Sequence, residues 1–218
     1  MKIQNNEYNG KIFKHDNLEE AVFEGCTFIG CDFSHTKMHS SQFINCQFYD
    51  RDSEKGCLFR YADLRDASFK QCKLAMSDFS GANIFGAEFR DSDLKGANFF
   101  KASCANIITQ RSFFCSLFIT GCNLSYCNLQ GMTIEKCDLF ENKWSGANLV
   151  GASLQGSDLS RGVFSSDVWG DFNLQNCDLS HCELEGLDPR RVNLHGVKIC
   201  DWQQEQLLEP FGIVVMPG

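Results

Sequence analysis

The sequence has little proline, no long apolar run and no excess of basic residues. Only 3 of its 218 residues are proline, and no apolar stretch approaches the ~20 residues that a membrane-spanning helix needs. The formal net charge of −8 argues against a protein that neutralises nucleic-acid phosphates, so we expect no direct binding to nucleic acid. Residues 1–10 are polar and lack the hydrophobic region of a signal peptide, which predicts a cytoplasmic location.

The 13 cysteines do not follow a metal-binding pattern. There is no Cys-x-x-Cys pair and no zinc spacing, so we expect no metal and no cofactor. Most of the cysteines occupy a position that holds Ala62 or Ser92 elsewhere, which indicates a need for small volume rather than for a thiol. Cys115 lies outside this position, and packing is still the favoured interpretation for it. No catalytic set of side chains and no phosphate-binding loop stands out, so the sequence predicts no enzyme.

What the sequence does have is a period of five. Large apolar residues recur at every fifth position from Phe114 to Ile199, failing once at Pro189, and the second residue before each is usually small. The same pattern covers residues 23–48 and 59–99. This period belongs neither to a strand nor to a helix. It indicates a repeat in which each unit turns two side chains inward, and it predicts a single solenoid-like domain over residues 1–218.

The phase of the repeat breaks first after Phe48. Residues 51–56 are mostly charged and end in a glycine, a residue suited to positive φ, so we expect an exposed loop. The candidate partner-binding residues in this loop are Arg51, Asp52, Ser53, Glu54, Lys55 and Gly56.

A second break covers residues 102–113, where the five-residue step lands on Cys104 and Thr109 instead of large apolar residues. A solvated loop has no reason to carry so much apolar surface, so this loop either contacts a partner or folds its isoleucines back onto the coil. Its candidate partner-binding residues are Ser103, Cys104, Ala105, Asn106, Ile107, Ile108, Thr109, Gln110, Arg111, Ser112 and Phe113.

The C-terminal segment, residues 201–218, contains a group of large apolar residues. Residues 201–209 predict a short helix with Asp201 as its N-cap and Pro210 as its end. A last open coil exposes unpaired backbone, which a two-fold partner would cover. Capping by the helix within a monomer is the alternative. The candidate dimer residues are Trp202, Leu207, Leu208 and Phe211.

The motif Ala-Asp/Asn-Leu, seen at residues 62–64 and 147–149, resembles the pentapeptide repeat family. The resemblance implies an all-β fold: a right-handed, quadrilateral parallel β-helix with four units per coil, here with two projecting loops and a short C-terminal helix. The two loops, segments 136–142 and 186–191, and the ending at 202–205 resemble the Qnr quinolone-resistance proteins over nearly the whole chain. That resemblance implies a C-terminal homodimer that binds DNA gyrase and topoisomerase IV and protects them from fluoroquinolones. It also implies that the loops take part and that the rod imitates duplex DNA.

With four units per coil, positions 20 apart stack on one face. We therefore expect an acidic face made of Glu88, Asp91, Asp138, Glu141, Asp158 and Asp178. Like charges at the ~4.8 Å strand spacing repel, and DNA carries phosphates at a comparable ~3.4 Å per strand. In the alternative interpretation, the acids satisfy turn backbone groups and are a by-product of the repeat. Because fold does not fix function, a scaffold for an unrelated protein partner remains the alternative function.

Overall fold

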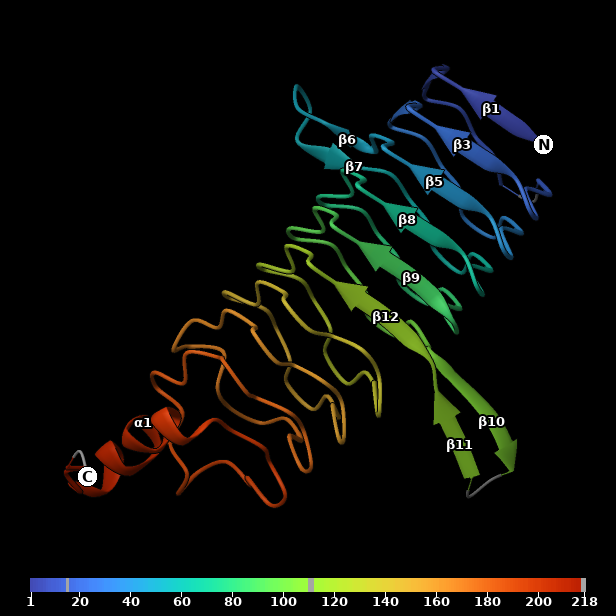
Figure 1. Cartoon of the computed structure of the whole chain (residues 1–218). Helices are drawn as coiled ribbons and strands as arrows, with labels where there is room; N and C mark the ends of the chain where they lie inside the picture. Colours follow the sequence, from blue (N-terminus) through green and yellow to red (C-terminus); the bar gives the residue numbers. More distant parts are fainter. Residues whose placement is uncertain (15, 110–111, 217–218) are drawn as a thin grey trace.

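The chain forms a rod of stacked coils, with the N-terminus at one end and a short helix at the other (Figure 1). The computed structural model describes residues 1–14, 16–109 and 112–216. One side of the rod is a parallel sheet of six strands. Its strands are β1 (Lys2–Gln4), β3 (Val22–Glu24), β5 (Gln42–Ile44), β8 (Ser68–Lys70), β9 (Ala87–Arg90) and β12 (Leu117–Thr120). On another side, β2 (Glu7–Asn9) pairs in parallel with β4 (Thr27–Ile29).

The pairing register confirms four five-residue units per coil. Partner residues in regular coils are 20 positions apart, as are Val22 and Gln42. The separation rises to 26 across the first loop, between Gln42 and Ser68, and to 30 across the second, between Ala87 and Leu117. Elsewhere, single bridges 20 residues apart continue the stack. The predicted β-helix is therefore confirmed, and each loop is an insertion that leaves the register after it unchanged.

Columns of stacked rings fill the N-terminal half of the rod. The ring of Phe69 stacks on those of Phe43 and Phe89 with centroids 4.9 and 5.0 Å apart. A neighbouring column runs through Phe59 and Phe79 at 4.8 Å, and rings of the two columns meet edge to face. Offset stacks and edge contacts are the favourable arrangements of aromatic rings. The inward phenylalanines thus fill each layer and also contact the next one.

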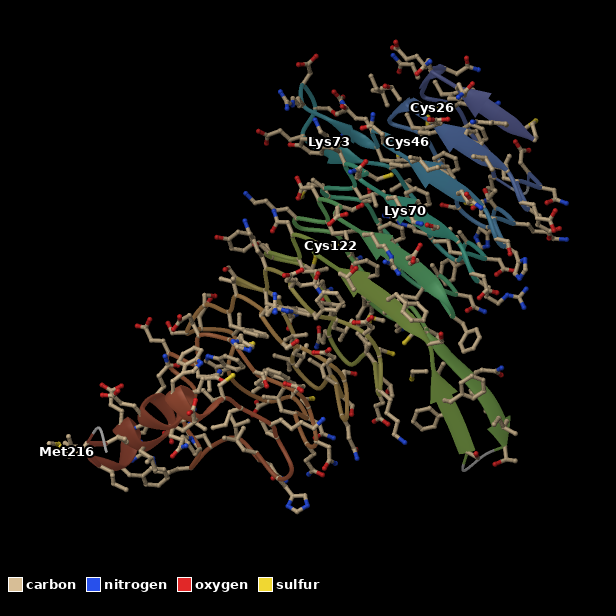
Figure 2. The ribbon with its side chains drawn as sticks, in the orientation of Figure 1. Cys26, Cys46, Lys70, Lys73, Cys122 and Met216 are labelled. Atoms are coloured by element: carbon tan, nitrogen blue, oxygen red, sulfur yellow. The ribbon has the colours of Figure 1, made fainter. Side chains whose placement is uncertain are left out.

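The small inward position of the repeat holds side chains that donate hydrogen bonds as well as small apolar side chains. The Sγ atoms of Cys46 and Cys72 donate to the carbonyls of Phe23 and Phe43 on the preceding coil, at 3.5 and 3.4 Å. Thr36 makes the same contact through its hydroxyl, at 2.9 Å. Cys26, Cys46 and Cys122 are all buried, at three different levels along the rod (Figure 2). In this position a thiol packs and donates a weak hydrogen bond, which agrees with a requirement for small volume.

Two predicted inward positions are wrong. Phe114 lies in the second loop and is half exposed, so the regular series resumes at Ile119. In the eighth coil Val168 is buried in place of Trp169, whose Nε1 donates to the Glu185 carbonyl at 2.9 Å. The backbone leaves its regular path here, because Gly146 N donates to the Ser165 hydroxyl instead of to a carbonyl of the next coil. Val168 is buried in this coil, and the partly buried indole of Trp169 packs against the core with its ring 4.5 Å from that of Phe164.

The rod ends in a short helical segment. It comprises a 3-10 turn (Asp201–Gln203), the helix α1 (Gln204–Leu208) and a second 3-10 turn (Glu209–Phe211). Cys200 is the N-cap and Asp201 is the first helical residue, so the predicted cap is one position too late. Gln203 is fully buried, and its Nε2 donates to the carbonyls of Leu179 and Cys182 at 2.9 and 2.7 Å. These bonds fix the segment to the last regular coils. No helix in the described part of the chain is long and apolar enough to cross a membrane.

Candidate functional site

The second loop is an antiparallel hairpin of β10 (Ala105–Thr109) and β11 (Ser112–Cys115) that projects from the rod (Figure 1). The predicted range of 102–113 needs correction at both ends. Ala102 and Cys104 are buried in the coil, and Ser103 N donates to the Ala82 carbonyl at 2.9 Å. Cys104 fills the interior position where the repeat usually holds a large residue. The hairpin therefore begins at Ala105 and continues to Cys115.

The hairpin carries an exposed apolar cluster. Ile107 and Ile108 are 75% and 64% exposed, and Phe113 and Phe114 are 46% and 47% exposed. The isoleucines therefore do not fold back onto the coil, and that alternative is wrong. Asn106, Thr109 and Ser112 are also exposed, while Ala105 is half-buried. Gln110 and Arg111, also predicted here, lie outside the described residues.

Phe114 belongs to the same cluster but was assigned to the interior, because the five-residue step happens to land on it. The adjacent pair Phe113–Phe114 could have revealed this, since neighbours in a strand point to opposite faces. The Phe114 ring packs edge to face against the ring of Phe85, with the two centroids 5.3 Å apart. This contact places Phe114 where the hairpin joins the rod.

The first loop is a smaller hairpin, with β6 (Tyr49–Asp50) paired to β7 (Lys55–Gly56). The side chains of Arg51, Asp52, Ser53, Glu54 and Lys55 are all exposed. The expected role of Gly56 is wrong, because positive φ falls on Glu54 instead. A Cβ added to Gly56 would lie 2.3 Å from Ser77 N, so glycine is needed there for close packing against the neighbouring coil. The two hairpins leave the rod at opposite corners (Figure 1).

The predicted acidic face is present as a column on the rod. Asp138, Asp158 and Asp178 form successive parallel bridges. Glu88 pairs with Phe118, which in turn bridges to Asp138. Asp91 and Glu141 lie at the adjoining corner, with Gly121 between them. All six acids thus share one side of the rod.

Several acids in this column have basic partners. Glu88 is 3.3 Å from Lys70 Nζ and also pairs with Arg90. Glu141 pairs with Arg161 at 3.5 Å and Asp178 with Lys198 at 3.9 Å. Among the described residues no ion pair reaches Asp91, Asp138 or Asp158. Burial, and then the neighbouring Asp158 carboxylate, raise the pKa of Asp138. One Asp138 oxygen is buried without a hydrogen-bond partner. The negative charge that no ion pair compensates is therefore carried by the stacked Asp138 and Asp158 and by Asp91 at the adjoining corner.

Side chains at the position of these acids also accept hydrogen bonds from backbone N–H groups in the turns. Asp158 Oδ1 accepts a bond from Ser160 N at 2.9 Å, and Asn128 Oδ1 accepts the same bond from Gln130 N at 3.2 Å. Asparagine adds a second contact, because Asn148 Nδ2 donates to Asn128 Oδ1 on the preceding coil at 3.2 Å. Aspartates stacked on each other lack this donor and repel. The turn role thus explains a short polar residue here but does not explain the charge.

We expect Asp158→Asn to stabilise the fold by roughly 0.5–1.5 kcal/mol at neutral pH, the worth of one net hydrogen bond. The new amide can donate to Asp138, and the repulsions between residue 158 and the stacked Asp138 and Asp178 carboxylates disappear. The raised pKa of Asp138 means that the ionised form of this carboxyl opposes folding and the protonated form does not. The gain should therefore shrink as pH falls and Asp138 becomes protonated in both the folded and the unfolded chain. Urea unfolding at two pH values measures it.

Asp178→Asn is the matched control, since Asp178 already has Lys198 at 3.9 Å. Its gain should be smaller. An equal gain for both variants, or none for Asp158→Asn, would show that repulsion in the column is negligible.

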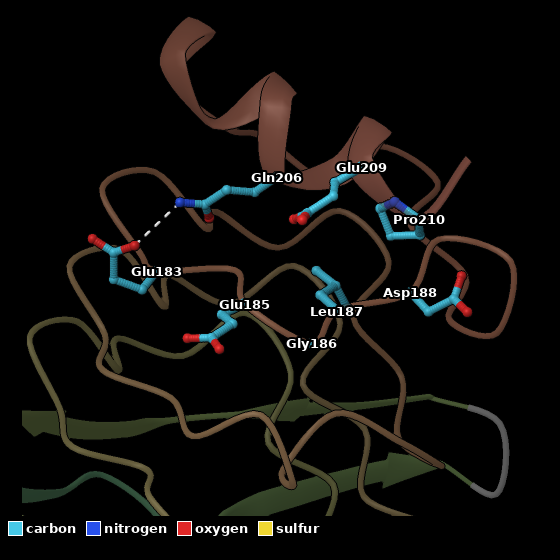
Figure 3. Close-up of a pocket in the computed structure, with 8 residues that line it drawn as sticks. All are labelled: Glu183, Glu185, Gly186, Leu187, Asp188, Gln206, Glu209 and Pro210. Atoms are coloured by element: carbon cyan, nitrogen blue, oxygen red, sulfur yellow. Dashed lines mark hydrogen bonds between the residues drawn. The ribbon is translucent and has the colours of Figure 1, made fainter. Parts of the chain in front are cut away.

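The C-terminal end holds a cavity of about 510 Å³ between the helix and the last coil (Figure 3). Four carboxylates line it, from Glu183, Glu185, Asp188 and Glu209, and Gln206 bridges to Glu183 at 3.1 Å across its mouth.

The predicted dimer residues lie on the same segment. Trp202 and Phe211 are 49% and 50% exposed, whereas Leu207 and Leu208 are half-buried and Leu207 packs against the core. Val214 and Met216 beyond them are exposed, and Met216 projects at the end of the chain (Figure 2). The helix thus caps part of the last coil and leaves an apolar rim.

Comparisons with known proteins identify the repeat. A family model described as "Pentapeptide repeat region" matches residues 21–99, and one described as "Pentapeptide repeats (8 copies)" matches residues 173–199. The chain is 57% identical over 136 residues to a pentapeptide repeat protein of Vibrio parahaemolyticus, a match that covers 62% of this chain and 63% of the relative. It is 44% identical over 127 residues to the quinolone resistance pentapeptide repeat protein QnrB96 of Scandinavium goeteborgense, covering 58% of this chain and 59% of the relative. These matches span about three fifths of the relatives' length.

A structural comparison extends over the whole chain. The full-length structure of QnrB1, described as a plasmid-mediated fluoroquinolone resistance protein, superposes with a TM-score of 0.94 at 44% identity. The superposition covers 98% of this chain and 100% of QnrB1. Coils, loops and C-terminal segment are thus all included in the likeness.

Proposed function

This chain belongs to the Qnr-type pentapeptide repeat proteins, and on that premise we propose that it binds DNA gyrase and topoisomerase IV and protects them from fluoroquinolone inhibition. The observation that carries the proposal is the apolar hairpin. The hairpin projects Ile107, Ile108 and Phe113 out of the rod and into solvent, where they lie outside the packed core. Exposed apolar clusters of this kind mark protein contacts. Burying each large side chain in a partner is worth about 1.5–3 kcal/mol.

The acidic column supports a second part of the same contact. A row of carboxylates at strand spacing resembles a DNA strand in charge density, so it suits a basic surface that ordinarily holds DNA. Such a column speeds encounter and sets orientation in a salt-dependent way. In this proposal the column orients the rod and the hairpin makes the apolar contact. With its net charge of −8, the protein itself is not expected to bind nucleic acid.

The C-terminal rim supports a homodimer. Trp202 and Phe211 are half exposed beside the exposed Val214, and a second copy related by a two-fold axis would bury all three. The helical segment alone leaves this rim uncovered, which favours the dimer over self-capping. The proposal places the dimer in the cytoplasm, together with its target enzymes.

The direct test is supercoiling of relaxed plasmid by gyrase at an inhibitory ciprofloxacin concentration, with the protein titrated in. Recovery of supercoiling at about stoichiometric protein is expected, and higher salt should raise the protein concentration required. A folded, dimeric protein that restores no supercoiling would overturn the proposal. The chain would then be a β-helical scaffold for an unrelated protein partner, to be sought by pull-down.

A further inference from the structure

Three cysteines meet where the second hairpin joins the rod. Cys104 ends the coil that precedes β10, Cys115 ends β11, and Cys137 lies on the next coil. The Sγ atoms of Cys104 and Cys115 both donate to the carbonyl oxygen of Thr133, at 3.2 and 3.4 Å. Cys46 and Cys72, in contrast, each donate to a different carbonyl on the preceding coil. The shared acceptor holds the Cys104 and Cys115 sulfurs within reach of each other.

The two thiols are chemically unequal. The Cys104 thiol stabilises the neighbouring thiolate and lowers the pKa of Cys115 to about 7, although burial and the Glu135 carboxylate act in the opposite direction. Contacts with Cys115 and Cys137, together with burial, raise the pKa of Cys104 far above its usual value. A half-buried thiol of low pKa beside a buried thiol of high pKa is the arrangement of a nucleophilic and a resolving cysteine.

A small molecule has room to approach the nucleophile. Cys115 and Cys137 line a hollow of about 390 Å³, and Lys136, Asp138 and Asp158 bring charges of both signs to its wall. Cys104 is fully buried and does not line the hollow. An oxidant entering from solvent therefore meets Cys115 first.

We propose that Cys115 and Cys104 form a thiol–disulfide switch at the base of the hairpin, with a low-molecular-weight disulfide as the oxidant. The Cys115 thiolate attacks one sulfur of the small disulfide, forms a mixed disulfide and releases one small thiolate. The Cys104 sulfur then attacks Cys115 Sγ, and the second small thiolate leaves and takes up the Cys104 proton. Two protein thiols become one disulfide while the small disulfide is reduced to two thiols.

Oxidation changes how the hairpin is held. Both Thr133 hydrogen bonds disappear, because neither sulfur keeps its proton. The new bond joins residues that are not directly opposite, since Cys115 pairs with Ala105 and Ser116 N donates to the Cys104 carbonyl. The first rung of the hairpin must therefore shift. The disulfide forms within this chain alone and needs none of the proposed partners.

The test uses the full chain, reduced and then exposed to oxidised glutathione, quenched in acid and weighed intact. The expected product is lighter than the reduced chain by one hydrogen pair, and its digest contains residues 104 and 115 in one cross-linked peptide. Dithiothreitol reverses both changes. The rate should rise with pH around a midpoint near 7, where Cys115 ionises. Cys104→Ala should stop the reaction at a glutathione adduct on Cys115.

Cys137→Ser and Cys200→Ser are the controls, and both should still form the disulfide. A link between Cys115 and Cys137, a lasting adduct on Cys115 in the unaltered chain, or no reaction at all would overturn the proposal. If a variant does not fold, the peptide map of the unaltered chain still decides between these outcomes.

Discussion

Replacing residues 106–114 with an Asn-Gly turn is expected to abolish protection of gyrase and to leave the rod folded. Ala105 and Cys115 are paired across the hairpin, so two residues suffice to join them, and Cys104 stays in its interior position. The change removes all four exposed apolar side chains of the hairpin. In the proposed complex the partner buries Ile107 and Ile108. Losing even these two contacts should raise the protein concentration needed for protection roughly 100-fold or more.

The matched controls separate the apolar contact from general surface effects. Ile107→Ser with Ile108→Ser should lose most protection without shortening the chain. Ile12→Ser removes an isoleucine that is 68% exposed on an early coil and should protect normally. Supercoiling in the presence of ciprofloxacin provides the measurement, with circular dichroism and sedimentation to verify fold and dimer. Normal protection by the shortened, folded dimer would exclude the hairpin as the contact.

Phe69→Ala should destabilise the protein by about 3–5 kcal/mol, as large-to-small changes do in a packed core. Phe69 is fully buried, and its ring lies between Phe43 and Phe89 at 4.9 and 5.0 Å. Removing the ring opens a cavity within the column and interrupts the stack on both sides. Because each coil contacts only its neighbours, the damage should be largest in the coils beside the gap. Urea unfolding and hydrogen exchange measure the total loss and its location.

Phe69→Leu is the control for volume. The same column contains Ile119 and, further along, Leu139 and Leu159, all buried, so an aliphatic side chain suits this position. Its cost should be less than half that of Phe69→Ala. If the alanine variant lost less than about 1 kcal/mol, the stacked column would not be a main source of stability.

The period of five was sufficient to predict a repeat and to say which side chains point inward, and the resemblance to the pentapeptide repeat family supplied the β-helix with four units per coil. The sequence also predicted the Asp138–Asp158–Asp178 ladder, since stacking follows from the period once four units form a coil. It could not predict which acids have basic partners. Arg161 reaches Glu141 and Lys198 reaches Asp178 from adjacent coils, and those contacts depend on side-chain conformation.

The errors occurred where the chain leaves the period. The step assigned Phe114 inward although it lies in a hairpin, and it placed the hairpin's start before Cys104, which is buried. Cys104 occupies a position where the repeat normally holds a larger apolar residue, so the sequence pattern did not indicate that it is buried. The meeting of Cys104 and Cys115 at Thr133 depends on where β11 returns to the rod, and the repeat does not specify that point. Glycine is required at position 56 for a different reason than the expected positive φ, because the backbone that excludes a Cβ there belongs to residues 75–77 on the next coil.

The unchanged register after each insertion has an evolutionary consequence. Coils on either side of a hairpin stack as though it were absent, since partners 26 or 30 residues apart continue the same columns as partners 20 apart. Mutations that lengthen, shorten or replace a hairpin therefore need no compensating change in the interior. Target recognition can diversify in these two segments while the architecture is inherited intact, and a hairpin transplanted between related rods should retain its conformation.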